Sequence, residues 1–134
     1  MLHSFSFTGG SDGGAPVAGL IADTSGALYG TTSEGGIGNN GTVFKLTPPA
    51  KGQTTWTETV LYRFTGSDGS GPVAGLIADN LGALFGTTLN GGISNNGTVF
   101  KLTPPGVRPV GQRPCSIDSA RSQAAATAMR LGLA

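Results

Sequence analysis

The stretch NNGTVFKLTPP runs from Asn39 to Pro49 and recurs letter for letter from Asn95 to Pro105. Sliding the sequence by 56 positions lays residues 16–49 over residues 72–105, and 28 of these 34 positions are identical. Upstream, LHSFSFTGGSDGGAP matches LYRFTGSDGSGP once three residues are treated as an insertion. A period of this length is typical of stacked or radially repeated units. The sequence therefore predicts two copies of one structural unit.

Each copy has the pattern of four short strands separated by turns. PVAGLIAD (16–23) is apolar almost without a break, which predicts a strand covered on both faces. An Asp and a Gly three residues later predict a tight turn into the second strand, ALYGTT (27–32). A polar loop ending in Asn-Gly leads to TVFKLTP (42–48), which alternates with period two, and TTWTETVLYRF (54–64) is rich in β-branched and aromatic residues.

The predicted fold class is all-β, with two tandem four-stranded antiparallel sheets that resemble the blades of a β-propeller. We divide the chain into a first unit at 2–49 with a preceding outer strand, a second unit at 50–106, and a non-repeat tail at 107–134. A compact β-sandwich, in which the two repeats face each other, is the alternative. The expected core consists of Leu20, Ile21, Leu28, Phe44, Leu46, Leu76, Ile77, Leu84, Phe100 and Leu102.

The motifs GLIADTSGALYGTT, GLIADNLGALFGTT and GTVFKLTPP resemble the choice-of-anchor tandem repeat family, also called GloVer or Gloeo/Verruco repeats. Their core is also similar to blades of two-component-regulator propellers. The resemblance covers about residues 2–106. It implies an exported or surface-anchored bacterial repeat protein, although the N-terminus has no pattern of a signal peptide.

In the blade interpretation, 16–23 is the innermost strand and 54–64 is the outermost. The first strand, Leu2 to Phe7, then belongs to a preceding blade, and the second unit lacks its outer strand. We therefore expect a truncated or frame-disrupted piece of a longer propeller. The open edges at Leu2 to Phe7 and Thr98 to Thr103 are expected to favour self-association.

The tail has a different composition from the repeats. Residues 1–106 carry a net charge of −2 and residues 107–134 a net charge of +3. SIDSARSQAAATAMRLGL predicts a helix capped by Ser116 or Asp118, but Arg121 and Arg130 do not share one face of it. A frameshift product and a disordered segment are the alternatives.

Composition argues against several classes of function. Charged residues make up only 11% of the chain and form no basic stripe, so we expect no nucleic-acid partner. Apolar runs are too short for membrane insertion. Cys115 is the single cysteine, which excludes an internal disulfide. No motif requires a cofactor or a metal.

Loops at one end of the predicted sheets carry the densest polar cluster. Because adjacent strands run antiparallel, the TGGSDGGA and TGSDGSG connections share a rim with SEGGIGNNG and LNGGISNNG. Carboxylates and amides there are candidates for binding carbohydrate, protein or Ca²⁺, against the simpler interpretation that Asx and Gly residues make the turns. The candidate binding residues are Asp12, Glu34, Asn39, Asn40, Asp68, Asn90, Asn95 and Asn96.

No catalytic residues can be assembled from the sequence. His3 is solitary, and Asp23 and Asp79 are expected to cap turns. Lys45 and Lys101 fit a solvated strand face. We therefore predict a non-enzymatic repeat scaffold or binding module. The alternative is part of a propeller-based hydrolase or lyase whose catalytic residues lie in other blades.

Overall fold

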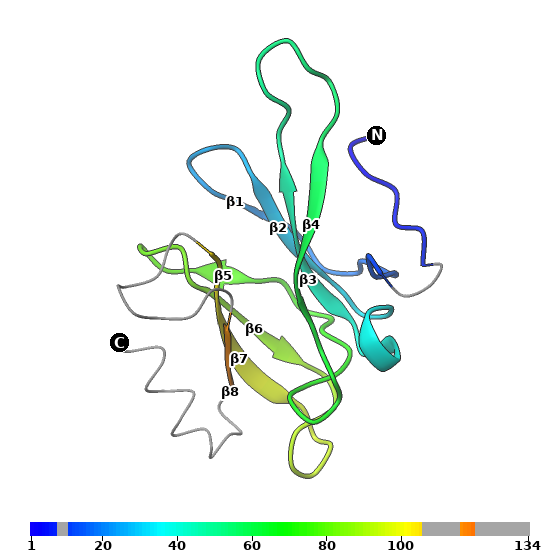
Figure 1. Ribbon diagram of the computed structural model, residues 1–134. Coiled ribbons are helices and arrows are strands. Elements are labelled where there is room, and N and C mark those ends of the chain that lie inside the picture. Colours follow the sequence, from blue (N-terminus) through cyan, green and yellow to red (C-terminus); the bar gives the residue numbers. More distant parts are fainter. Residues whose placement is uncertain (8–10, 106–115, 120–134) are drawn as a thin grey trace.

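The computed structural model describes residues 1–7, 11–105 and 116–119, and these fold into two antiparallel sheets (Figure 1). The first sheet has the order β1-β2-β3-β4 and the second β5-β6-β7-β8. No α-helix occurs in these described ranges, which contain one short 3-10 turn at Ile37–Asn39. The strands are β1 (Ile21–Ala22), β2 (Leu28–Thr32), β3 (Thr42–Thr47), β4 (Thr57–Arg63), β5 (Ile77–Ala78), β6 (Leu84–Thr88), β7 (Thr98–Thr103) and β8 (Ser116–Ser119). The predicted all-β class and the division into two sheets are confirmed.

Repeated sequence produces repeated register. Leu28 pairs with Leu46 in the first sheet, and Leu84 pairs with Leu102 in the second. At the loop end of the central hairpin, the hydroxyls of Thr32 and Thr42 lie 2.7 Å apart, and the corresponding pair in the second sheet lies 2.8 Å apart. These threonines are buried, so their mutual hydrogen bonds offset the cost of removing hydroxyls from water.

Each sheet has two different faces, because successive side chains of a strand point to opposite sides. We call one the Val face: it carries Ile21, Tyr29, Thr31 and Val43 in the first sheet, and Ile77, Phe85, Thr87 and Val99 in the second. We call the other the Leu face: it carries Leu20, Leu28, Phe44 and Leu46 in the first sheet, and Leu76, Leu84, Phe100 and Leu102 in the second.

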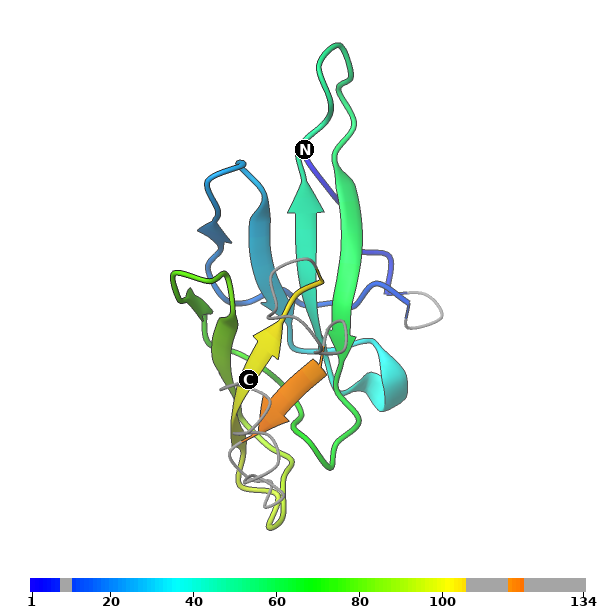
Figure 2. The same ribbon diagram turned by 60° about the vertical axis from the view of Figure 1, so that its left-hand side comes forward.

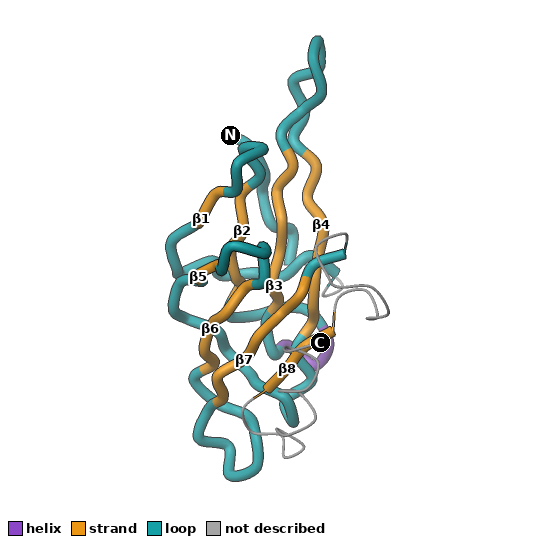
Figure 3. Tube along the Cα trace, turned by 90° about the vertical axis from the view of Figure 1, so that its left-hand side faces the viewer, coloured by secondary structure: helices purple, strands orange, loops and turns teal. Residues whose placement is uncertain are grey.

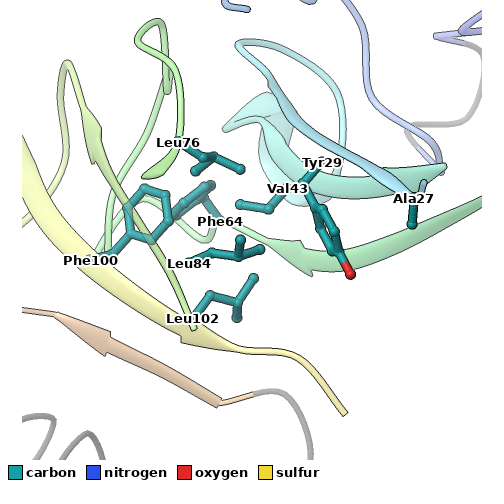
Figure 4. Packing of buried hydrophobic residues seen from close by; sticks show 8 residues of the cluster. All are labelled: Ala27, Tyr29, Val43, Phe64, Leu76, Leu84, Phe100 and Leu102. Atoms are coloured by element: carbon teal, nitrogen blue, oxygen red, sulfur yellow. The ribbon is translucent and has the colours of Figure 1, made fainter. Parts of the chain in front are cut away.

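The core lies between the Val face of the first sheet and the Leu face of the second. Val43 points into the cluster that contains Leu76 and Leu84, and the Tyr29 ring lies at its edge with the hydroxyl turned away, as Figure 4 shows. Phe64 and Phe100 complete this core, with ring centroids 5.1 Å apart. The strands of both sheets follow one another in the same order across the molecule, with β1 and β5 on one side and β4 and β8 on the other (Figures 2 and 3). The two units therefore pack through different faces, the Val face of the first against the Leu face of the second. We call this arrangement head to tail.

Six of the ten expected core residues are buried, Ile21 and Leu28 are half-buried, and two are exposed. Leu20 and Ile77 are exposed, and the strand predicted over 16–23 is only the two-residue β1. Leu20 lies on the Leu face of the first sheet and Ile77 on the Val face of the second, so each is on an outer face. The prediction that the apolar segment is covered on both faces is therefore wrong.

The second sheet contains an outer strand that the repeat pattern did not predict. Ser116–Ser119 forms β8, which pairs antiparallel with β7 at Thr103↔Ser116 and Phe100↔Ser119. The helix predicted to begin at Ser116 or Asp118 is wrong for these four residues, and so is the prediction of an open edge at β7. An edge strand presents unpaired amides and carbonyls, which a nearby segment satisfies by adding a strand. The rest of the tail lies outside the described residues.

The first predicted strand, Leu2 to Phe7, is not a strand in the structure. It is held by side chains instead. Phe5 packs edge-on against Phe44, with 5.0 Å between ring centroids, in the same way that Phe64 packs against Phe100. Backbone pairing requires a neighbouring strand, and no described segment lies alongside residues 1–7 as one.

Candidate functional site

The polar loops predicted to share a rim do meet in each unit. Gly14 N donates to Glu34 O over 2.9 Å, and Ser70 N donates to Asn90 O over the same distance. Each of these isolated bridges also has the reciprocal hydrogen bond. The rim therefore exists as two connected loops per unit.

The aspartates of the rim are engaged in holding their own loops. Asp12 accepts hydrogen bonds from Ser6 N at 3.0 Å and Ser6 Oγ at 3.1 Å. Asp68 accepts from Thr65 N at 2.9 Å and from the Tyr62 hydroxyl. Partial burial raises the pKa of Asp12, but the hydrogen bonds from Ser6 outweigh it and lower the pKa below its usual value.

Three of the five candidate asparagines use their side chains within their own loops. Asn39 and Asn95 have positive φ, and their Oδ1 atoms accept from Gly35 N at 2.6 Å and Gly91 N at 2.8 Å. Asn40 Nδ2 donates to Ile37 O at 3.0 Å. These three side chains build turns, as Asx residues commonly do.

Five of the candidate rim residues are exposed, and three of these five make no side-chain hydrogen bond within the described residues. Glu34, Asn90 and Asn96 are exposed, and among the described residues their side chains have no hydrogen-bond partner. No three His, Cys, Asp or Glu side chains in the described part of the chain gather into a metal-binding group. A ligand at this rim thus stays a prediction.

His3 lies near Asp12, with 3.7 Å between Nε2 and Oδ2, and its ring packs against Phe5. Glu58 is close enough for both charges to affect it, but burial is the largest influence and raises its pKa. Neither the His3 Nε2 nor the Glu58 Oε1 atom has a hydrogen-bond partner among the described residues. Sequence reasoning could not detect this proximity, because His3, Asp12 and Glu58 belong to different segments.

An open groove of about 670 Å³ lies between the two units, at the Asp-x-x-Gly turns. One wall is the β1–β2 turn and the other is the β5–β6 turn. Sequence reasoning missed this groove, since it arises only when both turns are placed side by side. Its lining residues are Ile21, Ala22, Asp23, Thr24, Ser25, Tyr29, Ala78, Asp79, Asn80, Leu81, Gly82 and Leu84.

Asp23 caps its turn, as predicted. Its Oδ1 atom accepts from Ser25 Oγ at 2.6 Å, Ser25 N at 2.8 Å and Ala27 N at 3.0 Å, and its Oδ2 atom accepts from the Tyr29 hydroxyl at 2.9 Å. The hydrogen bond from the Ser25 hydroxyl is the main reason that the pKa of Asp23 falls to about 2, against the opposing effect of burial. Burial, together with the Asp23 carboxylate, raises the pKa of Tyr29 to about 12.

Asp79 caps the second turn with fewer partners. Its Oδ1 atom accepts from Leu81 N and Ala83 N, both at 2.9 Å. Phe85 stands where the first unit has Tyr29, so no hydroxyl reaches Asp79 Oδ2 within the described residues. Within the described residues, the groove therefore holds one carboxylate that accepts hydrogen bonds on both oxygens and one that accepts them on Oδ1.

Comparisons with known proteins bear on the repeat. No curated protein and no solved structure matches this chain. In the described residues, no helix has the length and apolar character needed to cross a membrane. The profile of the Gloeobacter/Verrucomicrobia repeat matches residues 1–127, which is nearly the whole sequence. The resemblance read from the GLIAD and GTVFKLTPP motifs is confirmed, and the chain belongs to the Gloeobacter/Verrucomicrobia repeat family.

Proposed function

We propose that this chain is a non-catalytic repeat module of an exported or surface-located bacterial protein, and that it binds carbohydrate in the groove between its two units. The observation that carries this proposal is the groove itself, whose walls are the corresponding turns of both repeats. A ligand there contacts both units at once. The equal strand order of the sheets and their head-to-tail packing support blade-like units of a propeller.

The lining of the groove suits a polyhydroxylated ligand. Asp79, Asn80 and Thr24 provide oxygen and amide groups that can hydrogen-bond sugar hydroxyls. Leu81 and Ile21 provide apolar surface against which the C–H face of a sugar ring can pack. Polar groups placed beside apolar surface in one depression are typical of small-molecule sites.

The pKa values of Asp23 and Tyr29 favour a binding role over a catalytic role for these two groups. Hydrolysis of a glycosidic bond usually requires one carboxylic acid that keeps its proton near neutral pH. Asp23, with its pKa lowered to about 2, is ionised there and cannot supply that proton. Tyr29, with its pKa raised to about 12, keeps its proton and cannot act as a base.

A glycan array probed with the purified chain, followed by calorimetry on any glycan retained, tests the proposal. Asn80→Ala is expected to weaken binding by up to about tenfold, the effect of one lost hydrogen bond. Asn96→Ala, on the loop rim, is the matched control and is expected to bind as the wild type does. Silence across the array contradicts a carbohydrate ligand. Weakening by Asn96→Ala alone moves the site to the rim.

A further inference from the structure

The Val face of the second unit is uncovered, although its counterpart in the first unit is at the centre of the core. Val43 has 0% of its surface exposed and Val99 has 55%. Ile21 is half-buried against the core, whereas Ile77 is exposed. These residues are identical in the two units, so the difference arises from what lies against them.

The Leu face of the first unit is uncovered beside β1, whereas Phe44 and Leu46 on the same face are buried, with Phe5 packed on Phe44. Leu76 is 3% exposed and its counterpart Leu20 is 50% exposed. Pro72 is fully buried and lies where a Cβ on Gly41 would meet its ring, whereas Pro16 is exposed. The molecule thus presents the Val face at one end, and at the other the part of the Leu face around Leu20, and both parts belong to the interface that joins its units.

We propose that this chain associates head to tail with a second copy of itself, the Val face of the second unit of one copy packing on the Leu face of the first unit of the next. The contact repeats the one between the two units within the chain. The apolar residue types in the proposed contact are those of the internal core, except that Phe85 takes the place of Tyr29.

The N-terminal segment fits this repetition. The two sheets have matching outer strands, since Ser119 stands opposite Phe100 in the second sheet as Val60 stands opposite Phe44 in the first. Residues 2–5, Leu-His-Ser-Phe, correspond to residues 61–64, Leu-Tyr-Arg-Phe. Phe5 already packs on its own sheet as Phe64 does inside the molecule. The next copy therefore carries the aromatic ring that closes the internal interface.

Lys101 lies on the uncovered Val face and does not prevent the contact. Its Nζ atom is 5.6 Å from the centre of the Phe85 ring, and Lys45 lies at the same distance from the Tyr29 ring. Lys45 occupies the face that is covered inside the molecule. Long lysine side chains can lie along apolar surface and keep their ammonium groups in water.

The proposed contact joins different faces, so it does not stop at two copies. Such interfaces form closed rings or open chains, depending on the rotation between neighbours. We expect sedimentation velocity of the purified chain to show species larger than a dimer, increasing with concentration.

Two variants are designed so that each blocks one of the two faces in the proposed contact. Val99→Asp places a charge on the Val face of the second unit, and Leu20→Asp places one on the Leu face of the first. Each variant alone is expected to lose the large species. Mixed together they are expected to form a one-to-one dimer and nothing larger, because one intact face of each kind remains. Ile93→Asp, at an exposed apolar loop residue on neither face, is the control and is expected to associate as the wild type does.

Circular dichroism of each variant verifies that the sheets are retained. A wild-type chain that sediments as a monomer at every concentration overturns the proposal. So does a folded Val99→Asp variant that associates normally, or a mixture of the two folded variants that forms no dimer.

Discussion

Thr31 carries a buried hydroxyl that has no hydrogen-bond partner among the described residues. Its counterpart, Thr87, is exposed to water. Valine has nearly the shape of threonine without the polar group, so Thr31→Val is expected to raise the free energy of unfolding by about 1 kcal/mol. Thr87→Val is expected to change it by less than about 0.5 kcal/mol. Denaturant unfolding of both variants measures the difference, and destabilisation by Thr31→Val contradicts the prediction.

Asp23 should make stability depend on acid pH. Its pKa is about 2 in the folded protein against 3.8 for an ordinary aspartate, so the ionised form stabilises the fold. This contribution is fully present above the unfolded pKa and disappears as the pH falls through the folded pKa. We expect the stability gap between wild type and Asp23→Asn to shrink between about pH 4 and pH 2. A pH series of denaturant unfolding curves measures it, and a gap that stays constant over this range refutes the assignment.

Gly86 and Gly30 occupy the same position on β6 and β2, facing an aromatic ring. A Cβ on Gly86 would lie 2.6 Å from Phe100 Cζ and 2.9 Å from Leu76 Cδ2, and both residues are buried. A Cβ on Gly30 would lie 2.7 Å from Cζ of the buried Phe44 and 2.6 Å from Leu20 Cδ2, but of these two neighbours Leu20 is exposed and can move. Gly86→Ala is therefore expected to cost about 1–3 kcal/mol, and Gly30→Ala less. Equal losses of stability for the two variants in thermal unfolding would contradict this explanation, in which the exposed Leu20 moves aside.

At the scale of elements, the sequence predicts pairing better than burial. The hairpin β2–β3 follows from alternating residues on either side of an Asn-Gly loop, a local pattern that does not depend on neighbours. The apolar run at 16–23, by contrast, does not by itself predict which of its side chains are buried. Leu20 and Leu76 are the same residue in the same local sequence, yet only Leu76 is buried. Burial there depends on whether another unit lies against the face.

The candidate sites show the same limit across the whole molecule. The rim loops meet as predicted, because antiparallel connectivity fixes which loops share an end. The groove between Asp23 and Asp79 was not predictable, since it depends on how one unit is placed on the other. Strand β8 was equally hidden, because the sequence of Ser116–Ser119 does not match that of β4, the strand that holds the same place in the first sheet.

Phe64 lies where the two units become one molecule. It follows β4 of the first sheet, is fully buried, and packs on Phe100 of the second sheet and on Tyr62. Phe64→Ala is therefore expected to cost about 3–5 kcal/mol. Phe5→Ala, its counterpart on the outer face, is expected to cost clearly less, because Phe5 remains partly in water.

Hydrogen exchange shows whether each variant destabilises both sheets or only one. Because the core is shared, opening it should expose amides of both β3 and β7, so Phe64→Ala is expected to speed exchange in both sheets. Phe5→Ala is expected to affect the first sheet alone, where Phe5 contacts Phe44. If Phe64→Ala speeds exchange only in the second sheet, the two units open independently. The stability of each would then rest on contacts within it, and the head-to-tail core would add little to either.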